Sequence, residues 1–81
     1  MTISLTYFGP AREAVGLERE KLEVAGRMTV AELMEWLRSE RPLLRPIIDS
    51  CRVAVGTRYA TPDEGIEPDA EVALIPPVAG G

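Results

Sequence analysis

Side chains that usually carry chemistry are scarce in this sequence. Histidine is absent, which removes the most common general base and metal ligand and leaves the single cysteine, Cys51, without an activating partner. Cys51 opens an apolar stretch, where a cysteine is more often a small buried hydrophobe than a nucleophile. Asp63 and Glu64 are adjacent carboxylates in a turn-rich segment, and no glycine-rich phosphate-binding loop is present. We therefore expect the chain to bind no metal or cofactor itself and not to be a catalyst on its own.

The sequence closes on IPPVAGG, residues 75–81, and the α-carboxylate of Gly81 is its one chemically distinctive group. A carboxylate reacts only after activation, for example as a mixed anhydride with AMP. Glycine lacks a Cβ, so paired glycines fit a narrow channel in a partner, although a frayed end is the plain alternative. Prolines favour an extended lead of about 3 Å per residue, so residues 76–81 would span on the order of 18 Å. The residues expected to position Gly81 are Pro76, Pro77, Val78, Ala79 and Gly80.

Length and composition describe one small domain. The chain has 81 residues, 46% of them apolar, and its single cysteine excludes an internal disulfide. No apolar run approaches the ~20 residues of a membrane span, so a soluble, cytoplasmic protein is expected. The net charge is -4, and residues 59–81 carry acids but no base. Such a segment repels phosphate backbones and is attracted to a basic protein surface, so we expect neither nucleic acid nor a membrane as a partner.

Hydrophobic periodicity predicts strands on both sides of one main helix. In TISLTYF, residues 2–8, apolar and polar side chains alternate, as in a strand with one buried face. Thr29 and Glu32 have the spacing of a capping box before a helix that should run to about Arg41. An early helical turn is expected in GPAREAVG, because proline suits a first helical position and glycine a last one. The other expected strands are residues 20–24, 51–55, 58–60 and 71–75.

The order of these elements predicts an α+β protein with the β-grasp, or ubiquitin-like, fold, in which a mixed sheet packs on one main helix. The first and last strands should be the parallel central pair, because both are strongly apolar on one face. Ferredoxins share this architecture but need several cysteines. We divide the chain into a β-grasp domain, residues 1–75, and an extended tail, residues 76–81.

The stretch AEVALIPPVAGG, residues 70–81, resembles the end of the MoaD family, the ubiquitin-like sulfur carriers that form the small subunit of molybdopterin synthase. The similarity continues through YF in the first strand, the AREAVG turn and the TVAELMEWL helix. Two positions depart from the family: Gly56 stands where Asn is frequent, and Ala70 stands where Gly is frequent. Glycine at position 56 keeps the tolerance for positive φ, whereas Ala70 implies a somewhat different turn.

The resemblance implies a mechanism whose catalytic sites are all on partners. A ubiquitin-activating-enzyme-like adenylyltransferase would use ATP to adenylate Gly81, and a sulfur donor protein would convert the adenylate to a thiocarboxylate. The large subunit of molybdopterin synthase would then catalyse transfer of the sulfur to precursor Z (cyclic pyranopterin monophosphate). Two carriers would serve one heterotetramer.

Docking of such partners needs a surface, and strand alternation places Phe8 and Ile75 on the face opposite the buried residues. If the first and last strands are neighbours, these two side chains form an apolar patch at the root of the tail. We expect this patch to anchor the large subunit and the activating enzyme, with Tyr59 as a third candidate for that role. The alternative is that Phe8 only closes the edge of the core.

Three other functions fit the same sequence. A sulfur carrier for thiamin synthesis or tRNA thiolation would share the chemistry and differ in its partner. A ubiquitin-like modifier would form isopeptide bonds with lysines. A non-covalent interaction module would use the sheet face and leave the tail inert.

Overall fold

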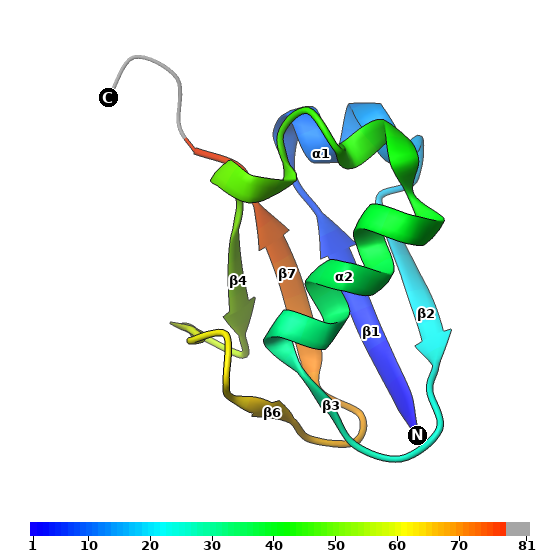
Figure 1. The fold of residues 1–81 in the computed structure, drawn as a ribbon, viewed down its shortest axis with the longest axis vertical. Helices are drawn as coiled ribbons and strands as arrows, with labels where there is room; N and C mark the ends of the chain where they lie inside the picture. The colour runs from blue at the N-terminus through cyan, green and yellow to red at the C-terminus, as the bar shows by residue number, and fades with distance from the viewer. Residues whose placement is uncertain (78–81) are drawn as a thin grey trace.

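The computed structural model describes residues 1–77 as a mixed sheet with helices packed on one face (Figure 1). The five strands lie in the order β2-β1-β7-β4-β5. β1 and β7 are parallel neighbours at the centre, and the other neighbouring pairs are antiparallel. This confirms the predicted β-grasp arrangement and its central pair. The strands are β1 (Thr2–Tyr7), β2 (Arg19–Glu23), β4 (Arg52–Val55), β5 (Arg58–Tyr59) and β7 (Glu71–Ile75).

The main helix, α2 (Val30–Glu40), lies across the sheet (Figure 1). Its first turn is closed by the predicted capping box, in which the Thr29 hydroxyl accepts from the Glu32 N–H and the Glu32 carboxylate accepts from the Thr29 N–H. The helix ends before Arg41 because proline follows that residue. Across residues 1–77, no helix is long and apolar enough to cross a membrane. The shorter helical elements are α1 (Gly9–Val15), η1 (Pro42–Leu44) and η2 (Ile48–Ser50).

The core fills the space between the sheet and α2. Side chains at alternate positions of β1 and β7 point into it, as period-two strands require. The two 3-10 elements contribute Leu44 and Ile48, both of which are buried in this core. Among the fully buried side chains are Ile3, Leu5, Tyr7, Leu33, Leu37 and Leu74.

Tyr7 is buried in this core, and its hydroxyl group is bound by an ion pair between Glu20 and Arg41. The hydroxyl donates to Glu20 on β2, and Arg41 binds the same carboxylate through two N···O contacts of 2.5 and 3.1 Å. Burial, and then the hydrogen bond to Glu20, raises the pKa of Tyr7. Burial alone would raise the pKa of Glu20, but the hydrogen bonds from Arg41 and Tyr7 outweigh it and lower that pKa. Arg41 also lies over the Trp36 ring, 4.9 Å from its centroid.

The structure differs from the predicted elements at two places. β1 ends at Tyr7, one residue early, because Gly9 takes a φ of +50° and Phe8 becomes the N-cap residue of α1. A separate two-stranded sheet pairs β3 (Met28–Thr29) with β6 (Gly65–Ile66), and neither strand was among those expected from the sequence. Two residues are too few to show a period of two. The other predicted strands agree to within one residue at each end.

Two turns agree with what their residue types allow. Gly56, between β4 and β5, has a φ of +64°, which glycine adopts without strain. In the turn before β7, Asp69 takes the left-handed conformation with a φ of +63°. The positive φ of this turn is therefore at Asp69 and not at Ala70. A glycine at position 70 could adopt a positive φ itself, so the turn differs from one built on glycine there.

Candidate functional site at the root of the tail

The root of the tail is the end of β7, between β1 and β4. Ile75, the last residue of β7, lies opposite Arg52 in β4, and Pro76 and Pro77 follow it. Proline has no N–H to donate, so β7 cannot extend its pairing through these residues. The chain leaves the sheet at the end opposite its N-terminus (Figure 1). The remaining predicted site residues, Val78, Ala79, Gly80 and Gly81, lie outside the described residues.

Phe8, Tyr59 and Ile75 line one shallow hollow of about 370 Å³ on the open face of the sheet, opposite α2. Ala54 and Ala73 line it as well, and we call these five residues the tail-root patch. Phe8 is 44% exposed and Tyr59 is 52% exposed, so neither side chain is part of the core. The structure therefore brings together the three residues that the sequence singled out for docking.

Strand register explains why the hollow forms. Thr6, Ala73, Ala54 and Tyr59 are successive neighbours across β1, β7, β4 and β5, so their side chains form one row on the open face. The two alanines in the middle of this row are small. The larger side chains of Phe8, Tyr59 and Ile75 project further from the sheet than these alanines do, which leaves a hollow between them.

Arg52 belongs to the same surface, and the sequence analysis missed it. It faces the same side of β4 as Ala54, and its guanidinium carbon lies 4.1 Å from the centroid of the Tyr59 ring. Alternation within residues 51–55 could have placed Arg52 on the open face. The contact with Tyr59, however, depends on β5, a strand of only two residues.

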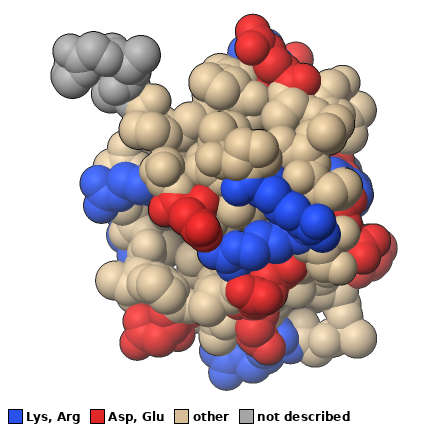
Figure 2. Space-filling view, turned by 45° about the horizontal axis from the view of Figure 1, so that its top comes forward, with Lys and Arg blue, Asp and Glu red and all other residues tan. Residues whose placement is uncertain are grey.

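Several charged side chains around the sheet are held in ion pairs. Arg58, next to Tyr59, binds Glu64 at 2.8 Å, and this hydrogen bond is the main cause that lowers the pKa of Glu64 and raises the pKa of Arg58. Arg38 on α2 likewise binds Glu35 and Asp49. Figure 2 shows Lys and Arg atoms beside Asp and Glu atoms on the face it presents. Folding therefore places a basic side chain, Arg58, beside one of the acids of residues 59–81.

Cys51 lies just before β4 and is half-buried, with its Sγ 3.4 Å from the carbonyl oxygen of Ile47. Burial raises the pKa of the thiol, which disfavours the reactive thiolate. In the described part of the chain, no three His, Cys, Asp or Glu side chains are grouped so that they could hold a metal ion.

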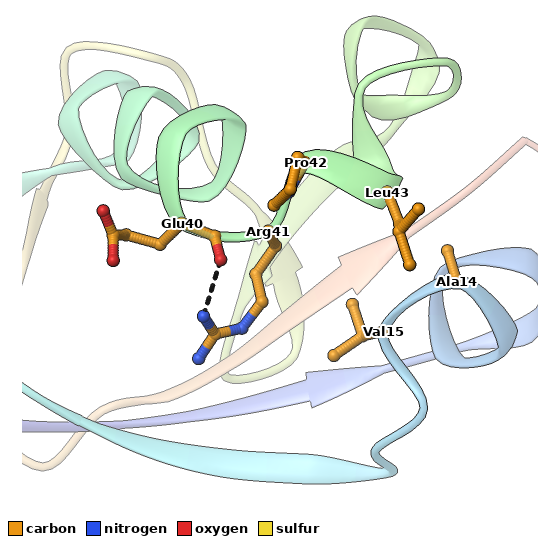
Figure 3. A pocket seen from close by; sticks show the side chains of 6 residues that line it. All are labelled: Ala14, Val15, Glu40, Arg41, Pro42 and Leu43. Atoms are coloured by element: carbon orange, nitrogen blue, oxygen red, sulfur yellow. Dashed lines mark hydrogen bonds between the residues drawn. The ribbon is translucent and has the colours of Figure 1, made fainter.

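A second, smaller hollow of about 130 Å³ lies between α1 and the end of α2 (Figure 3). Ala14, Val15 and Leu43 give it apolar walls, and Arg41 at its edge donates to the Glu40 carbonyl oxygen at 2.8 Å. Because the Arg41 guanidinium is also engaged by Glu20, the hollow lacks the convergent polar groups of a ligand site.

Comparison with known proteins places this geometry in a family. The model of the ThiS family matches residues 5–81, which include the tail-root patch and the terminal glycines. The chain belongs to the ThiS family. The family resemblance noted in the sequence is thereby confirmed.

Relatives of this ThiS-family chain share a name. The molybdopterin synthase sulfur carrier subunit of Mycobacterium tuberculosis is 35% identical over 80 residues, which cover 98% of this chain and 96% of the relative. The protein of the same name from Chlamydomonas reinhardtii is 29% identical over 83 residues and matches along the whole of both chains.

Solved structures confirm the ubiquitin-like β-grasp fold. SAMP1 from Haloferax volcanii superposes with a TM-score of 0.84 at 26% identity, over the whole of both chains. A chain from the complex of subunits 1 and 2 of the molybdopterin-converting factor of Helicobacter pylori superposes with a TM-score of 0.73 at 22% identity, again over the whole of both chains.

Proposed function

We propose that this chain is the sulfur-carrier subunit of a molybdopterin synthase and that Gly81 carries the sulfur as a thiocarboxylate. The observation that carries the proposal is the full-length match to a relative of that name, together with a family match that includes Gly81. The geometry at the root of the tail supports it. Ile75 ends a central strand and belongs to the tail-root patch. A partner bound at this patch would therefore lie next to the start of the tail and could bind residues 78–81.

In the proposed chemistry, a carboxylate oxygen of Gly81 attacks the α-phosphorus of ATP, and pyrophosphate leaves. The donor protein then releases its sulfur as hydrosulfide, which forms a C–S bond to the carbonyl carbon of Gly81 as the C–O bond to AMP breaks, so that AMP leaves, a proton is lost and no oxidant or reductant is needed. On the large subunit, the thiocarboxylate sulfur forms a bond to precursor Z, and water then cleaves the C–S bond to Gly81, so that the sulfur stays on the pterin and Gly81 returns to a carboxylate. The ATP site belongs to the activating adenylyltransferase, and the catalytic residues for sulfur transfer belong to the large subunit.

The remaining residues position the reacting group. Residues 76–81 act as a tail that is separate from the domain of residues 1–75 and spans on the order of 18 Å when extended. Phe8, Tyr59 and Ile75 anchor the partner at the root of the tail, where the exposed rings of Phe8 and Tyr59 beside the half-buried Ile75 form an apolar surface that a protein can cover. A cytoplasmic site of action is proposed with this function, because the lone cysteine needs no oxidising compartment.

Intact mass spectrometry tests the carrier chemistry directly. After incubation with ATP, an activating enzyme and a sulfur source, the chain should gain about 16 mass units, the difference between sulfur and oxygen. A chain lacking Gly81 and a chain with one alanine added after Gly81 should both stay unmodified and keep the circular dichroism spectrum of the wild type. An unchanged wild-type mass, with full function after deletion of Gly81, would contradict the proposal.

A Phe8→Asp substitution tests the anchoring role. Because a charge replaces a central apolar contact, the Kd for the large subunit should rise at least about 30-fold. The free energy of unfolding should change by less than about 1 kcal/mol, since Phe8 is 44% exposed. A Phe8→Asp chain that binds the large subunit as tightly as the wild type would rule out the anchor.

One structural likeness favours a second candidate, a ubiquitin-like protein modifier. SAMP1 of H. volcanii, named a small archaeal modifier protein, is 26% identical over the whole of both chains. A modifier would form isopeptide bonds from Gly81 to lysines, which survive denaturation and reduction. Gel analysis after incubation with ATP and a cell extract should therefore show no ladder of conjugates if the carrier function is correct. A carrier for thiamin synthesis or tRNA thiolation would copurify with a different large protein, so identifying that protein distinguishes these pathways from molybdopterin synthesis.

A further inference from the structure

Arg52 stands at the border of the tail-root patch. It lies opposite Ile75 across the β4–β7 pair and shares the open face with Ala54. Its guanidinium stacks on Tyr59, 4.1 Å from the ring centroid. Stacking restrains the arginine side chain, and the N–H groups at the edge of the guanidinium stay available as donors.

Arg52 differs from three other arginines of this chain. Arg38, Arg41 and Arg58 each bind a carboxylate of this chain. Among residues 1–77, Arg52 makes no ion pair, and its side chain is exposed. A positioned, exposed guanidinium beside an apolar patch matches the make-up of protein interfaces, where arginine and aromatic residues are enriched.

We propose that Arg52 is a specificity-determining residue that binds a carboxylate of the large subunit when that subunit covers the tail-root patch. This inference rests on the proposed function. The partner surface it requires is an apolar site bordered by an Asp or Glu side chain, which the planar guanidinium binds through two parallel hydrogen bonds.

Distance assigns the carboxylate to the partner rather than to the reacting group. Arg52 is level with Ile75, and Gly81 lies six residues further along, on the order of 18 Å away when the tail is extended. A tail threaded into a partner therefore carries its adenylate or thiocarboxylate beyond the reach of Arg52. The pair orients the bound chain and takes no part in the chemistry.

The rest of the sheet makes this pair selective. Acidic residues are concentrated in residues 63–71, which lead into β7 at the end of the strand opposite the tail root (Figure 1). A partner carboxylate is repelled there and attracted at Arg52, which favours an orientation that satisfies both the apolar patch and the charge. Tyr59 contributes to both parts, as an apolar contact and as the platform for Arg52.

Binding of the purified large subunit to the full-length chain tests the proposal, measured by calorimetry at about 50 and about 300 mM salt. Arg52→Ala should raise the Kd at least about tenfold at low salt and should weaken the salt dependence of binding. Arg52→Lys keeps the positive charge but loses the paired N–H donors of the guanidinium, so its Kd should lie between those of the wild type and Arg52→Ala. Arg27→Ala is the matched control, because it removes an exposed arginine just before β3 and should leave Kd within about twofold.

The outcomes separate this inference from the proposed function. Binding by Arg52→Ala within about twofold of the wild type, while Phe8→Asp fails to bind, would overturn the role of Arg52 and leave the carrier function standing. An equal rise in Kd for Arg52→Ala and Arg27→Ala would show that only net charge matters, and this would also overturn the role of Arg52. Failure of the wild-type chain to bind the large subunit would overturn both. Restored binding of Arg52→Glu to a large subunit with one acidic residue changed to arginine would identify the partner carboxylate.

Discussion

Tyr7 and Phe8 are neighbours in the sequence and belong to opposite faces of the sheet. Tyr7 is fully buried under α2, and its hydroxyl is held by Glu20 and Arg41. Phe8 is 44% exposed and lines the tail-root patch. The covered face satisfies its polar groups and packs its apolar ones. The open face leaves the Phe8 ring partly exposed to water beside other apolar side chains, as at protein interaction sites.

The comparison teaches how a small domain can keep stability and recognition apart. Successive residues of a strand point to opposite sides, so each strand serves both faces. Substitutions on the open face should change binding with little effect on folding. Substitutions on the covered face should do the reverse, and the largest effects are expected there.

Two isoleucines provide the strongest test of this separation. Ile3 on β1 is fully buried on the covered face, whereas Ile75 on β7 lines the tail-root patch. Ile3→Ala should lower the free energy of unfolding by about 2–5 kcal/mol, because it removes buried methyl groups and leaves a cavity. Ile75→Ala should lower it by less than about 1 kcal/mol and weaken binding of the large subunit.

Urea unfolding followed by circular dichroism measures the first quantity, and calorimetry measures the second. The separation fails if Ile75→Ala is as destabilising as Ile3→Ala. It also fails if Ile3→Ala, at a temperature where it is fully folded, binds the large subunit more weakly than Ile75→Ala does.

The two tyrosines test the separation through pH. Burial and the hydrogen bond to Glu20 raise the pKa of Tyr7, so its neutral form is favoured in the folded state. The stabilisation is complete below the ordinary tyrosine pKa, near 10, and is lost as the pH rises above it. Tyr7→Phe should cost about 1–2 kcal/mol at neutral pH, where Glu20 loses a donor, and should flatten the alkaline fall in stability.

Tyr59→Phe is the matched control on the open face, since it keeps the ring that Arg52 covers. It should leave the free energy of unfolding within about 0.5 kcal/mol of the wild type. Urea titrations at a series of pH values from neutral to about pH 11 measure the free energy of unfolding of each variant and its dependence on pH. An alkaline slope in Tyr7→Phe as steep as that of the wild type would show that Tyr7 does not carry the dependence.

The arrangement of the faces could be predicted from the sequence, because alternation and neighbouring strands are local signals. Phe8 and Ile75 were placed together on that basis, with Tyr59 as a third candidate, and the structure brings all three to one hollow. The chemistry of the tail was assigned by elimination and resemblance. Its residues beyond Pro77 lie outside the described structure, so that assignment stays a prediction.

Features that depend on contacts between distant short elements could not be predicted. The Glu20–Arg41 pair under Tyr7 joins β2 to the end of α2, and neither strand nor helix periodicity pairs those two residues. Arg52 needs a two-residue strand to bring Tyr59 within reach. The β3–β6 pair is equally short, although it buries Ile66.

The capping box of α2 gives the smallest expected effect and the finest test of the separation. Thr29→Ala removes the hydroxyl that accepts from the Glu32 N–H, and this should lower the free energy of unfolding by about 1 kcal/mol. Thr29→Ser should retain most of that stability, since serine caps equally well. Because α2 lies across the sheet from the tail-root patch, both variants should bind the large subunit with a Kd within about twofold of the wild type. A Thr29→Ala chain that is folded but binds about tenfold more weakly would show that the helix-covered face influences the open one through the sheet.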